Sequence, residues 1–388
     1  MAAAIPLRLL SIGHSYVVAL NRRLVHELAV QGARQWQVVA LAPRTFQGDL
    51  RPIVLERESD STEYELRSAK VRFSRSAHLF WYDATLNDLL RQPWDVVHVW
   101  EEPYVLASVQ VARSIHRDTK LVISTFQNIR KPYPPPFSNF EGMVLTRADG
   151  VVAFGHTGLD VLQGRSELSG KPIRVIPVGV DVDAFRPSST ARAAVLSQFG
   201  WNHQGAPVVG FLGRFIVEKG LRVLCAALDQ IRSPWRALFV GGGPLEAELR
   251  RWADAWPGRV KILTTVRHSE VPEHLNAMDI LCAPSLTTER WREQFGRMLI
   301  EAFAAGVAVV GSNSGEIPFT VGKAGHIVAE GDVNAWATAI SLLLVDKDLR
   351  AELGARGRER ALDKFSWVSI AQHHLKFFEE ILEASTDL

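Results

Sequence analysis

The chain has 388 residues, of which 47% are hydrophobic and 22% are charged, and its 44 basic and 42 acidic side chains leave a formal net charge of +2. This balance gives no reason to expect a nucleic acid or a strongly acidic partner. The length exceeds what one hydrophobic core usually supports, so two domains are expected.

The cysteines and the hydropathy pattern bear on the compartment. Cys225 and Cys282 both lie in apolar runs, which is typical of buried, reduced thiols in a cytoplasmic protein. No uninterrupted apolar run is long enough to span a bilayer. Arg8 and Gly13 interrupt the apolar N-terminus, which is better explained as a buried strand than as a signal peptide. We therefore expect a cytoplasmic protein, and peripheral association with the inner face of the membrane stays open.

The first half alternates short apolar runs with segments of helical periodicity, which predicts a parallel sheet covered on both faces. In the first helical segment, Leu20, Leu24 and Leu28 fall on one side. Residues 44–76 are charged and poorly periodic, and are expected to form a hairpin or a loop. The predicted strands are 7–12, 38–42, 95–100, 121–126, 151–154 and 173–176, and the predicted helices are 17–30 and 104–116.

A second α/β unit begins near Pro187, where Ser188 is suited to cap a helix. Its predicted strands are 208–212, 237–240, 260–263, 280–283 and 307–311. Its predicted helices are 221–231, 245–252, 271–277, 297–305, 335–345 and 349–364, and an amphipathic helix at 368–382 ends the chain.

The most informative stretch runs from Pro284 to Pro318 and is predicted as a polar loop, a helix, a short strand and a turn. Glu293 lies in the loop, Gly296 at the helix start, and Glu301 about one turn inside the helix. A glycine lets a ligand approach the backbone, and the free amides of a helix N-terminus favour an anion. Two acids suited to hydroxyl groups thus flank an anion-binding point, which suits a sugar nucleotide. The plainer interpretation is two solvated acids.

This stretch resembles the donor-site signature of the retaining glycosyltransferases of family 4, which have the GT-B fold. The family pattern is a Pro-Ser pair, a Glu-x-Phe-Gly segment, a Glu-Ala pair and a turn that begins with Gly and ends with Pro. The matching residues here are Pro284-Ser285, Glu293 to Gly296, Glu301-Ala302 and Gly315 to Pro318, with seven residues between the two acids.

The resemblance implies an α/β fold with two Rossmann-like parallel-sheet domains facing each other across a cleft. The implied parts are an acceptor-side domain at 1–186, a nucleotide-sugar-binding domain at 187–365, and a C-terminal helix at 366–388 that crosses back to the first domain. The implied reaction moves a sugar from a nucleotide diphosphate sugar, by default a UDP-sugar, to an acceptor hydroxyl with retention of anomeric configuration. The partners would be this donor and a glycan, lipid or small-molecule acceptor, with no cofactor and no nucleic acid.

The segment after the predicted strand 208–212 is similar to the part of the family that holds the donor diphosphate. Arg214 follows Gly213, and Lys219 stands in a Glu-Lys-Gly triplet. Fixed cations there would stabilise the charge that grows on the β-phosphate as the sugar leaves. The resemblance implies Arg214, Lys219 and Glu293 as catalytic residues, with Glu293 holding the sugar ring.

Further donor contacts are implied for the ribose, the phosphates and the base. Glu301 would bind the ribose, the amides near Gly296 the phosphate oxygens, and the end of the strand 260–263 the base. The implied donor-binding residues are Gly213, Val266, Arg267, Phe295, Gly296, Arg297 and Glu301.

Polar residues also follow strands of the first half, and parallel sheets bind ligands beyond the C-terminal ends of their strands. Gly13 and His14 follow the first strand, in a loop that the family uses near the sugar and the acceptor. Glu101 and Glu102 follow the strand 95–100 and are candidates for acceptor hydroxyls. His14 is equally well explained as a polar cap, and the two acids as solvated carboxylates. His98, inside the strand, is expected to be a core histidine.

Gln127 follows the strand 121–126, at about the point where many family members carry a His. A Gln donates hydrogen bonds but exchanges no proton near neutral pH. This departure keeps two rivals open. One is a nucleotide-sugar epimerase of the same fold, which would turn over donor without an acceptor. The other is a non-catalytic donor-binding GT-B protein in a larger complex.

The sequence offers no metal site. No group of His, Cys, Asp and Glu has the spacing of zinc ligands. Asp181 and Asp183 match the Asp-x-Asp motif of metal-dependent transferases, but they follow a turn that resembles the inter-domain turn of the family. We therefore expect Asp181 to be structural and the protein to act without a metal.

Overall fold

The computed structural model describes residues 5–47, 52–57, 63–202 and 205–384. The chain divides into two compact units, one made of Met1–Pro177 with Trp367–Leu388 and the other of Val178–Ser366. The division lies earlier than the boundary predicted after residue 186. Just after the division, the Val180 amide donates to the carbonyl of Phe365, a residue of the same unit, at 2.7 Å.

The first unit is built on a seven-stranded sheet of order β11-β10-β9-β8-β1-β2-β5, in which the neighbouring strands run parallel. The strands are β1 Leu7–Ile12, β2 Trp36–Pro43, β5 Glu65–Ala69, β8 Val96–Val99, β9 Lys120–Thr125, β10 Gly150–Ala153 and β11 Ile173–Val175. The helices are α1 Arg23–Gly32, α2 Ala84–Leu90, α3 Leu106–Ser114, α4 Phe137–Arg147, α5 His156–Leu162 and α14 Trp367–Glu383.

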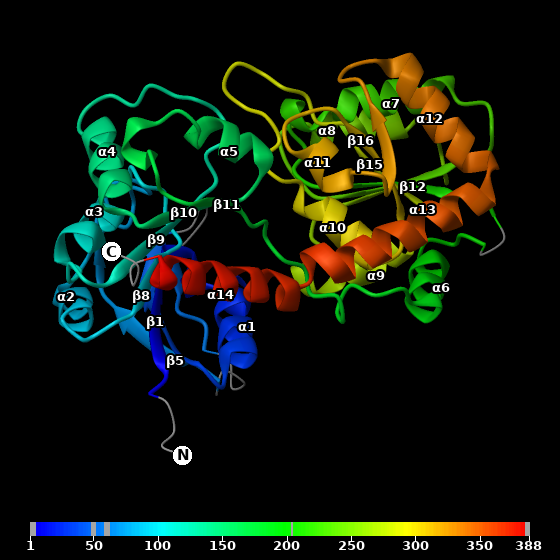
Figure 1. The fold of residues 1–388 in the computed structure, drawn as a ribbon. Coiled ribbons are helices and arrows are strands. Elements are labelled where there is room, and N and C mark those ends of the chain that lie inside the picture. The colour runs from blue at the N-terminus through cyan, green and yellow to red at the C-terminus, as the bar shows by residue number, and fades with distance from the viewer. Residues whose placement is uncertain (1–4, 48–51, 58–62, 203–204, 385–388) are drawn as a thin grey trace. The chain divides into compact units, whose positions relative to one another are not determined.

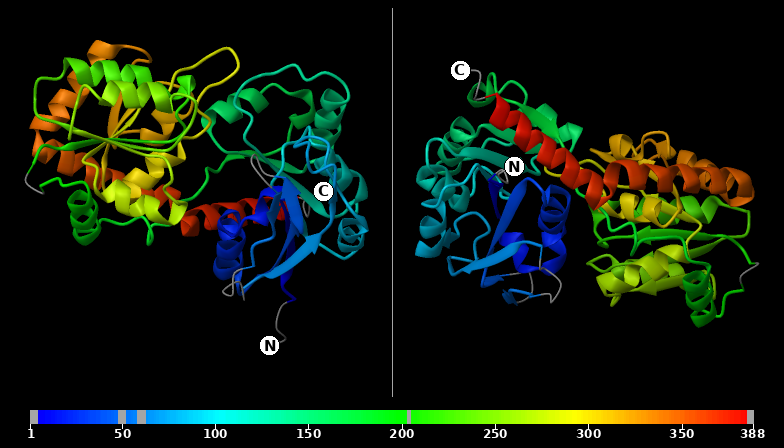
Figure 2. Two further views of the ribbon diagram at one scale, coloured as in Figure 1. Left: turned by 180° about the vertical axis from the view of Figure 1, so that it is seen from behind. Right: turned by 60° about the horizontal axis from the view of Figure 1, so that its bottom comes forward.

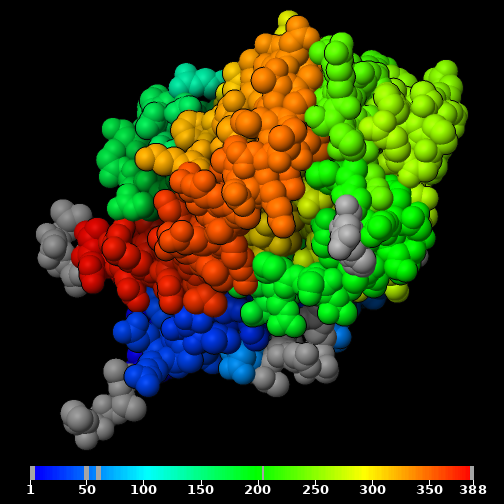
Figure 3. Space-filling model, turned by 90° about the vertical axis from the view of Figure 1, so that its right-hand side faces the viewer, coloured from blue at the N-terminus to red at the C-terminus, as the bar shows by residue number. Residues whose placement is uncertain are grey.

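Successive side chains of a strand point to opposite faces of the sheet and therefore pack into two different hydrophobic cores. Leu9 packs with the apolar residues of α1 and α14, whereas Leu10 packs with those of α2, α3 and α4. Figures 1 and 2 show these helices on the two faces of the sheet, and Figure 3 shows the red α14 against the blue N-terminal segment. Gly150 permits this packing, because a Cβ there would lie 2.5 Å from Ile381 Cδ1.

Parts of the first unit differ from the prediction. The helix expected at 17–30 becomes two 3-10 turns, η1 His14–Val17 and η2 Ala19–Arg22, followed by α1. Leu20 is 39% exposed and therefore does not share the buried side of Leu24 and Leu28. The region 44–76 holds a hairpin of β3 Thr45–Gln47 and β4 Pro52–Val54, then the sheet strand β5, then β6 Val71–Arg72, which pairs with β7 Trp81–Tyr82. The helices α2, α4 and α5 were not predicted.

The second unit is built on a six-stranded sheet of order β14-β13-β12-β15-β16-β17, again with parallel neighbours. The strands are β12 Val208–Leu212, β13 Arg236–Val240, β14 Val260–Leu263, β15 Ile280–Ala283, β16 Ala308–Ser312 and β17 Gly325–Val328. The helices are α6 Ser189–Gln198, α7 Leu221–Gln230, α8 Glu246–Ala253, α9 Val271–Asn276, α10 Arg297–Ala304, α11 Ile317–Val321, α12 Val333–Val345 and α13 Lys347–Arg360, and a π-helical turn, η6 Ala361–Phe365, follows α13.

Both sheets reverse their strand order at one point, next to their first strand. In the first unit β1 lies between β2 and β8, and in the second β12 lies between β13 and β15. The connections leave to opposite sides there, so the loops after β1 and β8, and after β12 and β15, diverge and leave a crevice suited to a ligand. Among the residues that the structure describes, no helix is long and apolar enough to cross a bilayer.

A line of polar side chains crosses the first sheet below its surface. Ser11 Oγ lies 2.8 Å from the Tyr16 hydroxyl and 3.1 Å from His98 Nδ1, and His98 Nε2 lies 2.8 Å from Ser124 Oγ. His98 is therefore a satisfied core histidine, as expected. The ring of His374, on α14, lies 5.6 Å from that of His98, and burial lowers the pKa of His374 to about 4.

We predict that acid destabilises the first unit through His374. An unfolded histidine takes up a proton below about pH 6.5, whereas the buried ring stays neutral down to about pH 4, so stability is complete above pH 6.5 and falls between these values. The loss is roughly 3 kcal/mol. Denaturant unfolding of His374→Leu at pH 4.5 and 7.5 should show a smaller pH dependence than the wild type. His373→Leu, which changes the exposed neighbouring histidine, is the control. An equal reduction of the pH dependence in that variant would contradict the assignment to His374.

Candidate functional site

In the second unit, the loops after β12 and β15 meet through an ion pair. Lys219 Nζ donates to Glu293 Oε2 at 2.5 Å, and Ser285 Oγ donates to the same oxygen at 2.8 Å. The two charged side chains are only 13% and 8% exposed. A carboxylate this buried requires such partners, because desolvation of an unpaired charge is costly. Sequence analysis proposed Lys219 and Glu293 as separate site residues, and the structure shows that they form an ion pair.

Glycines hold these loops close together. Gly220, with φ +69°, ends the turn that carries Lys219, and a Cβ there would lie 1.8 Å from the Pro284 carbonyl oxygen. Gly315, with φ +53°, packs on the backbone of Glu293, where a Cβ would lie 2.1 Å from the carbonyl oxygen. The Glu316 amide donates to that same oxygen at 3.0 Å. Gly220 and Gly315 pack closely on neighbouring backbone, which only a residue without a Cβ allows. This packing fixes the backbone on either side of the ion pair.

The helix α10 starts directly after Glu293. Gly296 is its N-cap, with φ +79° and no capping side chain; the Leu299 amide donates to the Gly296 carbonyl at 2.8 Å, and no side chain caps the Arg297 and Met298 amides before it. Phe295 is buried against Phe365, and the Phe295 carbonyl accepts a hydrogen bond from Thr320 Oγ1 at 3.1 Å. Arg297 is exposed at the start of the helix. This end of α10 is a fixed, electropositive point next to the buried ion pair.

Glu301 is buried one turn into α10. Burial raises the pKa of its carboxyl group to about 7, and the nearby Arg297 acts in the opposite direction. A carboxyl group poised at this value changes its charge near neutral pH, which is a common property of ligand-binding and catalytic sites.

Arg214 and the loop after β14 complete the donor-side candidates. Arg214 is exposed and, within the described part of the chain, its guanidinium makes no ion pair. It follows Gly213, whose carbonyl oxygen would lie 1.8 Å from a Cβ on Gly241. Arg267 is also exposed, but it is held by Glu270 at 2.9 Å, and Val266 beside it is half-buried. Arg214 is therefore available to bind a ligand, whereas the side chain of Arg267 is already held by Glu270.

Two residues that sequence reasoning did not propose belong to this region. Trp291 lies under Lys219, whose Nζ is 5.3 Å from the ring centroid. Partial burial and the charge of Arg297 lower the pKa of His268, which lies in the loop after β14. Trp291 could have been noticed in the sequence as a tryptophan among the polar residues before Glu293. Nothing in the sequence singled out His268.

In the first unit, His14 and Glu101 form a pair across β1 and β8. Glu101 accepts hydrogen bonds from the His14 backbone amide and, at 2.5 Å, from His14 Nδ1. The Glu101 side chain is 2% exposed, so it is not the solvated acid of the plainer interpretation. Gly13 has an extended backbone, and a Cβ there would lie 3.3 Å from Trp100 and from the ring of Tyr16.

Glu102 and Gln127 lie in a second polar group of this unit. Glu102 accepts from Thr125 Oγ1 at 2.5 Å and from the Phe126 amide at 2.8 Å, and burial raises its pKa to about 7. Gln127 Nε2 donates to Glu141 Oε1 at 2.8 Å, and the other Glu141 oxygen pairs with Arg165 at 2.7 Å. Gln127 is thus held by residues that the sequence did not single out.

Asp181 has a local role in the structure. Its Oδ1 accepts from the amides of Asp183 and Ala184 at 3.1 and 3.0 Å, which closes a turn. Within the described residues, no group of three or more His, Cys, Asp or Glu side chains is arranged to hold a metal ion.

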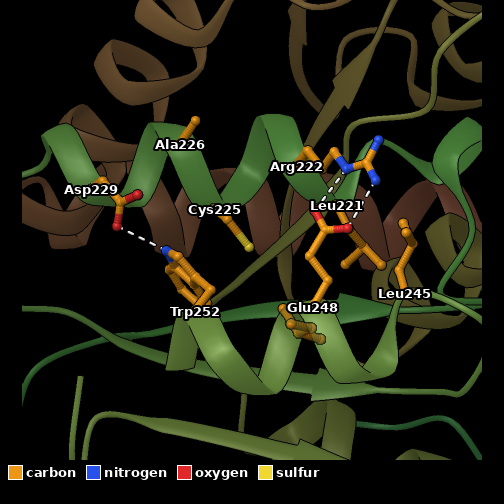
Figure 4. A pocket seen from close by; sticks show the side chains of 9 residues that line it. Leu221, Arg222, Cys225, Ala226, Asp229, Leu245, Glu248 and Trp252 are labelled. Atoms are coloured by element: carbon orange, nitrogen blue, oxygen red, sulfur yellow. Dashed lines mark hydrogen bonds and ion pairs between the residues drawn. The ribbon is translucent and has the colours of Figure 1, made fainter. Parts of the chain in front are cut away.

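A hollow of about 340 Å³ lies between α7 and α8 of the second unit (Figure 4). At one end Arg222 forms a fork with Glu248 at 2.7 and 2.8 Å, and at the other Trp252 Nε1 donates to Asp229 at 2.9 Å. None of the predicted site residues lines it, and its charged groups already have partners. The ion pair at the start of α10 is therefore the better candidate site.

Two family models match the chain. Residues 22–184 match the family described as Glycosyltransferase Family 4, and residues 206–346 match Glycosyl transferases group 1. Among solved structures, the sucrose-phosphate synthase of Thermosynechococcus elongatus superposes with a TM-score of 0.73 at 21% identity, covering 97% of this chain and 100% of the other. A glycosyltransferase from Rickettsia africae ESF-5 gives 0.75 at 17% identity, covering 98% and 99%. At these identities the likeness shows the GT-B fold.

Curated proteins extend the comparison. The phosphatidyl-myo-inositol mannosyltransferase of Mycolicibacterium smegmatis is 30% identical over 305 residues, which are 74% of this chain and 72% of that protein. The GDP-mannose-dependent alpha-(1-6)-phosphatidylinositol monomannoside mannosyltransferase of the same organism is 37% identical over 201 residues, 50% of this chain and 52% of that protein. The aligned part spans about half the length of this second relative.

We predict that the glycine contact at Glu293 is essential to the stability of the second unit. Gly258 has φ +76° with nothing within 4 Å of a Cβ, so Gly258→Ala carries only the left-handed backbone penalty, about 1–2 kcal/mol. Gly315→Ala adds a clash with the Glu293 backbone, worth about 1–3 kcal/mol more. The free energy of unfolding of both variants, measured with denaturant, tests this prediction. Equal losses of stability would show that the contact of Gly315 with the Glu293 backbone is not tight.

Proposed function

This chain belongs to glycosyltransferase family 4, and we propose that it transfers a sugar from a nucleotide diphosphate sugar to an acceptor hydroxyl with retention of anomeric configuration. The observation that carries the proposal is the buried Lys219–Glu293 pair beside the open N-terminus of α10. One short region presents a cation, a carboxylate and helix amides that no side chain caps, which match a phosphate and a sugar.

The proposed reaction depends on stabilising the leaving nucleotide diphosphate. As the bond between the anomeric carbon and the phosphate oxygen breaks, negative charge grows on the β-phosphate. Arg214, Lys219 and the amides after Gly296 would stabilise that charge, and Lys219 and the helix amides, which are held in place, need no reorganisation during the reaction. The diphosphate leaves on the face that the acceptor hydroxyl enters, which retains the configuration.

The two carboxylates of this region have different proposed partners. Glu293 holds the hydroxyls of the sugar ring, because it lies next to Lys219 at the start of α10. Glu301 lies one turn inside the helix and holds the ribose, away from the bond that breaks. The residues around Val266 and Arg267 contact the base.

The names of relatives bear on the donor and the acceptor. The sequence alone suggested a UDP-sugar by default. Because one relative named above is a GDP-mannose-dependent enzyme and two act on inositol lipids, we propose GDP-mannose as the first donor to test and an inositol-containing lipid as the first acceptor. Peripheral membrane association would follow from a lipid acceptor. The proposed acceptor contacts are residues that follow β1, β8 and β9, namely Gly13, His14, Glu101, Glu102 and Gln127.

We also propose that transfer needs no metal ion or other cofactor, since Arg214, Lys219 and helix amides supply positive charge and the carboxylate of Asp181 is used within its own turn. The test is product analysis by mass spectrometry and NMR with GDP-mannose or UDP-glucose, with and without acceptor, and with and without a chelator. Transfer in the presence of chelator supports the proposal. Donor turnover without acceptor would favour an epimerase, and binding without turnover a non-catalytic protein.

We predict that Arg214→Ala lowers turnover more than donor affinity. Its charge acts on the leaving phosphate, so the loss falls on the transition state, by about 2–4 kcal/mol. The kinetics at saturating donor measure it. Arg250→Ala, which removes an exposed arginine of α8 paired with Glu246, is the matched control. An unchanged turnover in Arg214→Ala would contradict the assignment.

We predict that donor affinity rises with pH through Glu301. Its pKa is raised to about 7, and the ionised form accepts stronger hydrogen bonds from ribose hydroxyls, so binding should tighten between pH 6 and 8. Calorimetry with the intact nucleotide sugar measures this, because a free nucleotide diphosphate has a phosphate that titrates in the same range. Glu301→Gln should bind more weakly at pH 8 and show no pH dependence. A dependence that survives the substitution would assign it to another group.

A further inference from the structure

Trp291 lies beside the buried ion pair of the second unit, in the same loop as Glu293. The ammonium of Lys219 lies over its indole, with Nζ 5.3 Å from the ring centroid and 2.5 Å from Glu293 Oε2. A lysine cation is attracted to the face of a tryptophan ring within about 6 Å of the centroid. The Lys219 side chain is only 13% exposed, so water screens this attraction little. Lys219 thus has two partners, a carboxylate and an aromatic ring.

Hydrogen bonds fix the backbone of the loop that carries Trp291. The Thr288 amide donates to the Trp291 carbonyl oxygen at 2.7 Å, which closes the segment between them into a tight loop. Two residues earlier, the Leu286 amide donates at 2.8 Å to the carbonyl oxygen of Glu218, the residue before Lys219. The loop that carries the ring is therefore tied to the turn that carries the ammonium.

The carboxylate and the ring hold the ammonium in different ways. Glu293 carries a full negative charge, which offsets the charge of Lys219 for any anion nearby. The indole has no net charge, only a quadrupole with a negative face, so it attracts the ammonium without offsetting its charge. A lysine that serves a diphosphate benefits from a contact of this second kind, because its stem is flexible and its head is a point charge.

We propose that Trp291 is a positioning residue, which holds Lys219 in place during sugar transfer. This proposal rests on the proposed function. The negative charge that grows on the leaving phosphate draws the ammonium of Lys219 away from Glu293. The indole then keeps the ammonium in position without competing for its charge. The contribution of the ring therefore falls on the transition state more than on the bound donor.

An indole at this place has two other roles open to it. It can stack on the donor sugar, or it can only fill space beside the buried ion pair. Stacking would strengthen the binding of the intact nucleotide sugar but not that of the bare nucleotide diphosphate. Filling space depends on the volume of the ring and not on its charge distribution. A change in the charge distribution of the ring at nearly constant shape therefore separates the three roles.

The experiment places tryptophans with one, two or three fluorine atoms on the benzo ring at position 291 of the full chain, by suppression of an amber codon. Fluorine weakens the negative face of the ring stepwise and hardly changes its size. We expect kcat at saturating donor to fall stepwise, by about 3- to 30-fold overall, which is the range of one cation–π contact. The affinities for GDP-mannose and GDP, or for UDP-glucose and UDP if that is the active donor, are measured by calorimetry and should stay within about twofold.

Two comparisons accompany the series. Trp252 is also a half-buried tryptophan of the second unit, and Figure 4 shows it at the hollow between α7 and α8, where its Nε1 donates to Asp229. Among the described residues, no lysine or arginine lies over its ring. The same fluorinated tryptophans at position 252 should leave kcat unchanged. Trp291→Phe, which retains a weaker aromatic face, should keep more of the rate than Trp291→Leu.

Three outcomes would overturn the proposal. A kcat that stays constant along the series shows that the charge distribution of the ring has no role, whatever the rate of Trp291→Leu. A loss of affinity for the nucleotide sugar alone, in step with fluorination, shows that the ring stacks on the sugar. Equal losses of rate at positions 291 and 252 show a general effect of fluorine. Failure of the proposed function is distinct, because the wild type would then transfer no sugar, and the role assigned to Trp291 would fall with it.

Discussion

The reversal of strand order next to the first strand of each sheet is the constraint on which the two candidate sites depend. At a reversal the flanking connections leave to opposite faces, so no helix covers the loops that follow the two central strands. In both units a basic side chain after the first strand meets a carboxylate after the strand beside it. Lys219 meets Glu293 in the second unit, and His14 meets Glu101 in the first. The same topology thus produces two related polar pairs from unrelated loop sequences.

Burial gives these pairs a structural as well as a chemical role. The Glu293 and Glu101 side chains are 8% and 2% exposed, and a carboxylate so placed is costly without its partner. Removing Lys219 alone would take an ion pair away from the buried Glu293 carboxylate, so the loss of activity in that variant would combine an effect on catalysis with an effect on stability. Double-mutant cycles that neutralise both partners separate these effects, because the pairwise term is then measured directly.

The fold was largely predictable because buried parallel strands are continuous apolar runs, and β1, β12, β14 and β15 begin and end where their sequences indicate. The strand β5 was missed because it lies at the sheet edge, where Glu65 and Arg67 give it a polar, short pattern. Gly296 and Glu293 could be named from a motif. The pairing of His14 with Glu101 could not, because 87 residues separate them and only the sheet register of β1 and β8 brings them together.

The place of α14 in the first unit has a consequence for synthesis of the chain. One of the two cores of that unit includes Ile370, Phe377 and Phe378, which are made after the whole of the second unit. The second unit, Val178–Ser366, is a continuous segment and is complete before them. On the ribosome, the second unit can therefore finish folding first, while the part of the earlier sheet that α14 covers beside α1 stays exposed until α14 leaves the exit tunnel. That interval is when the nascent chain is most exposed to aggregation and most in need of a chaperone.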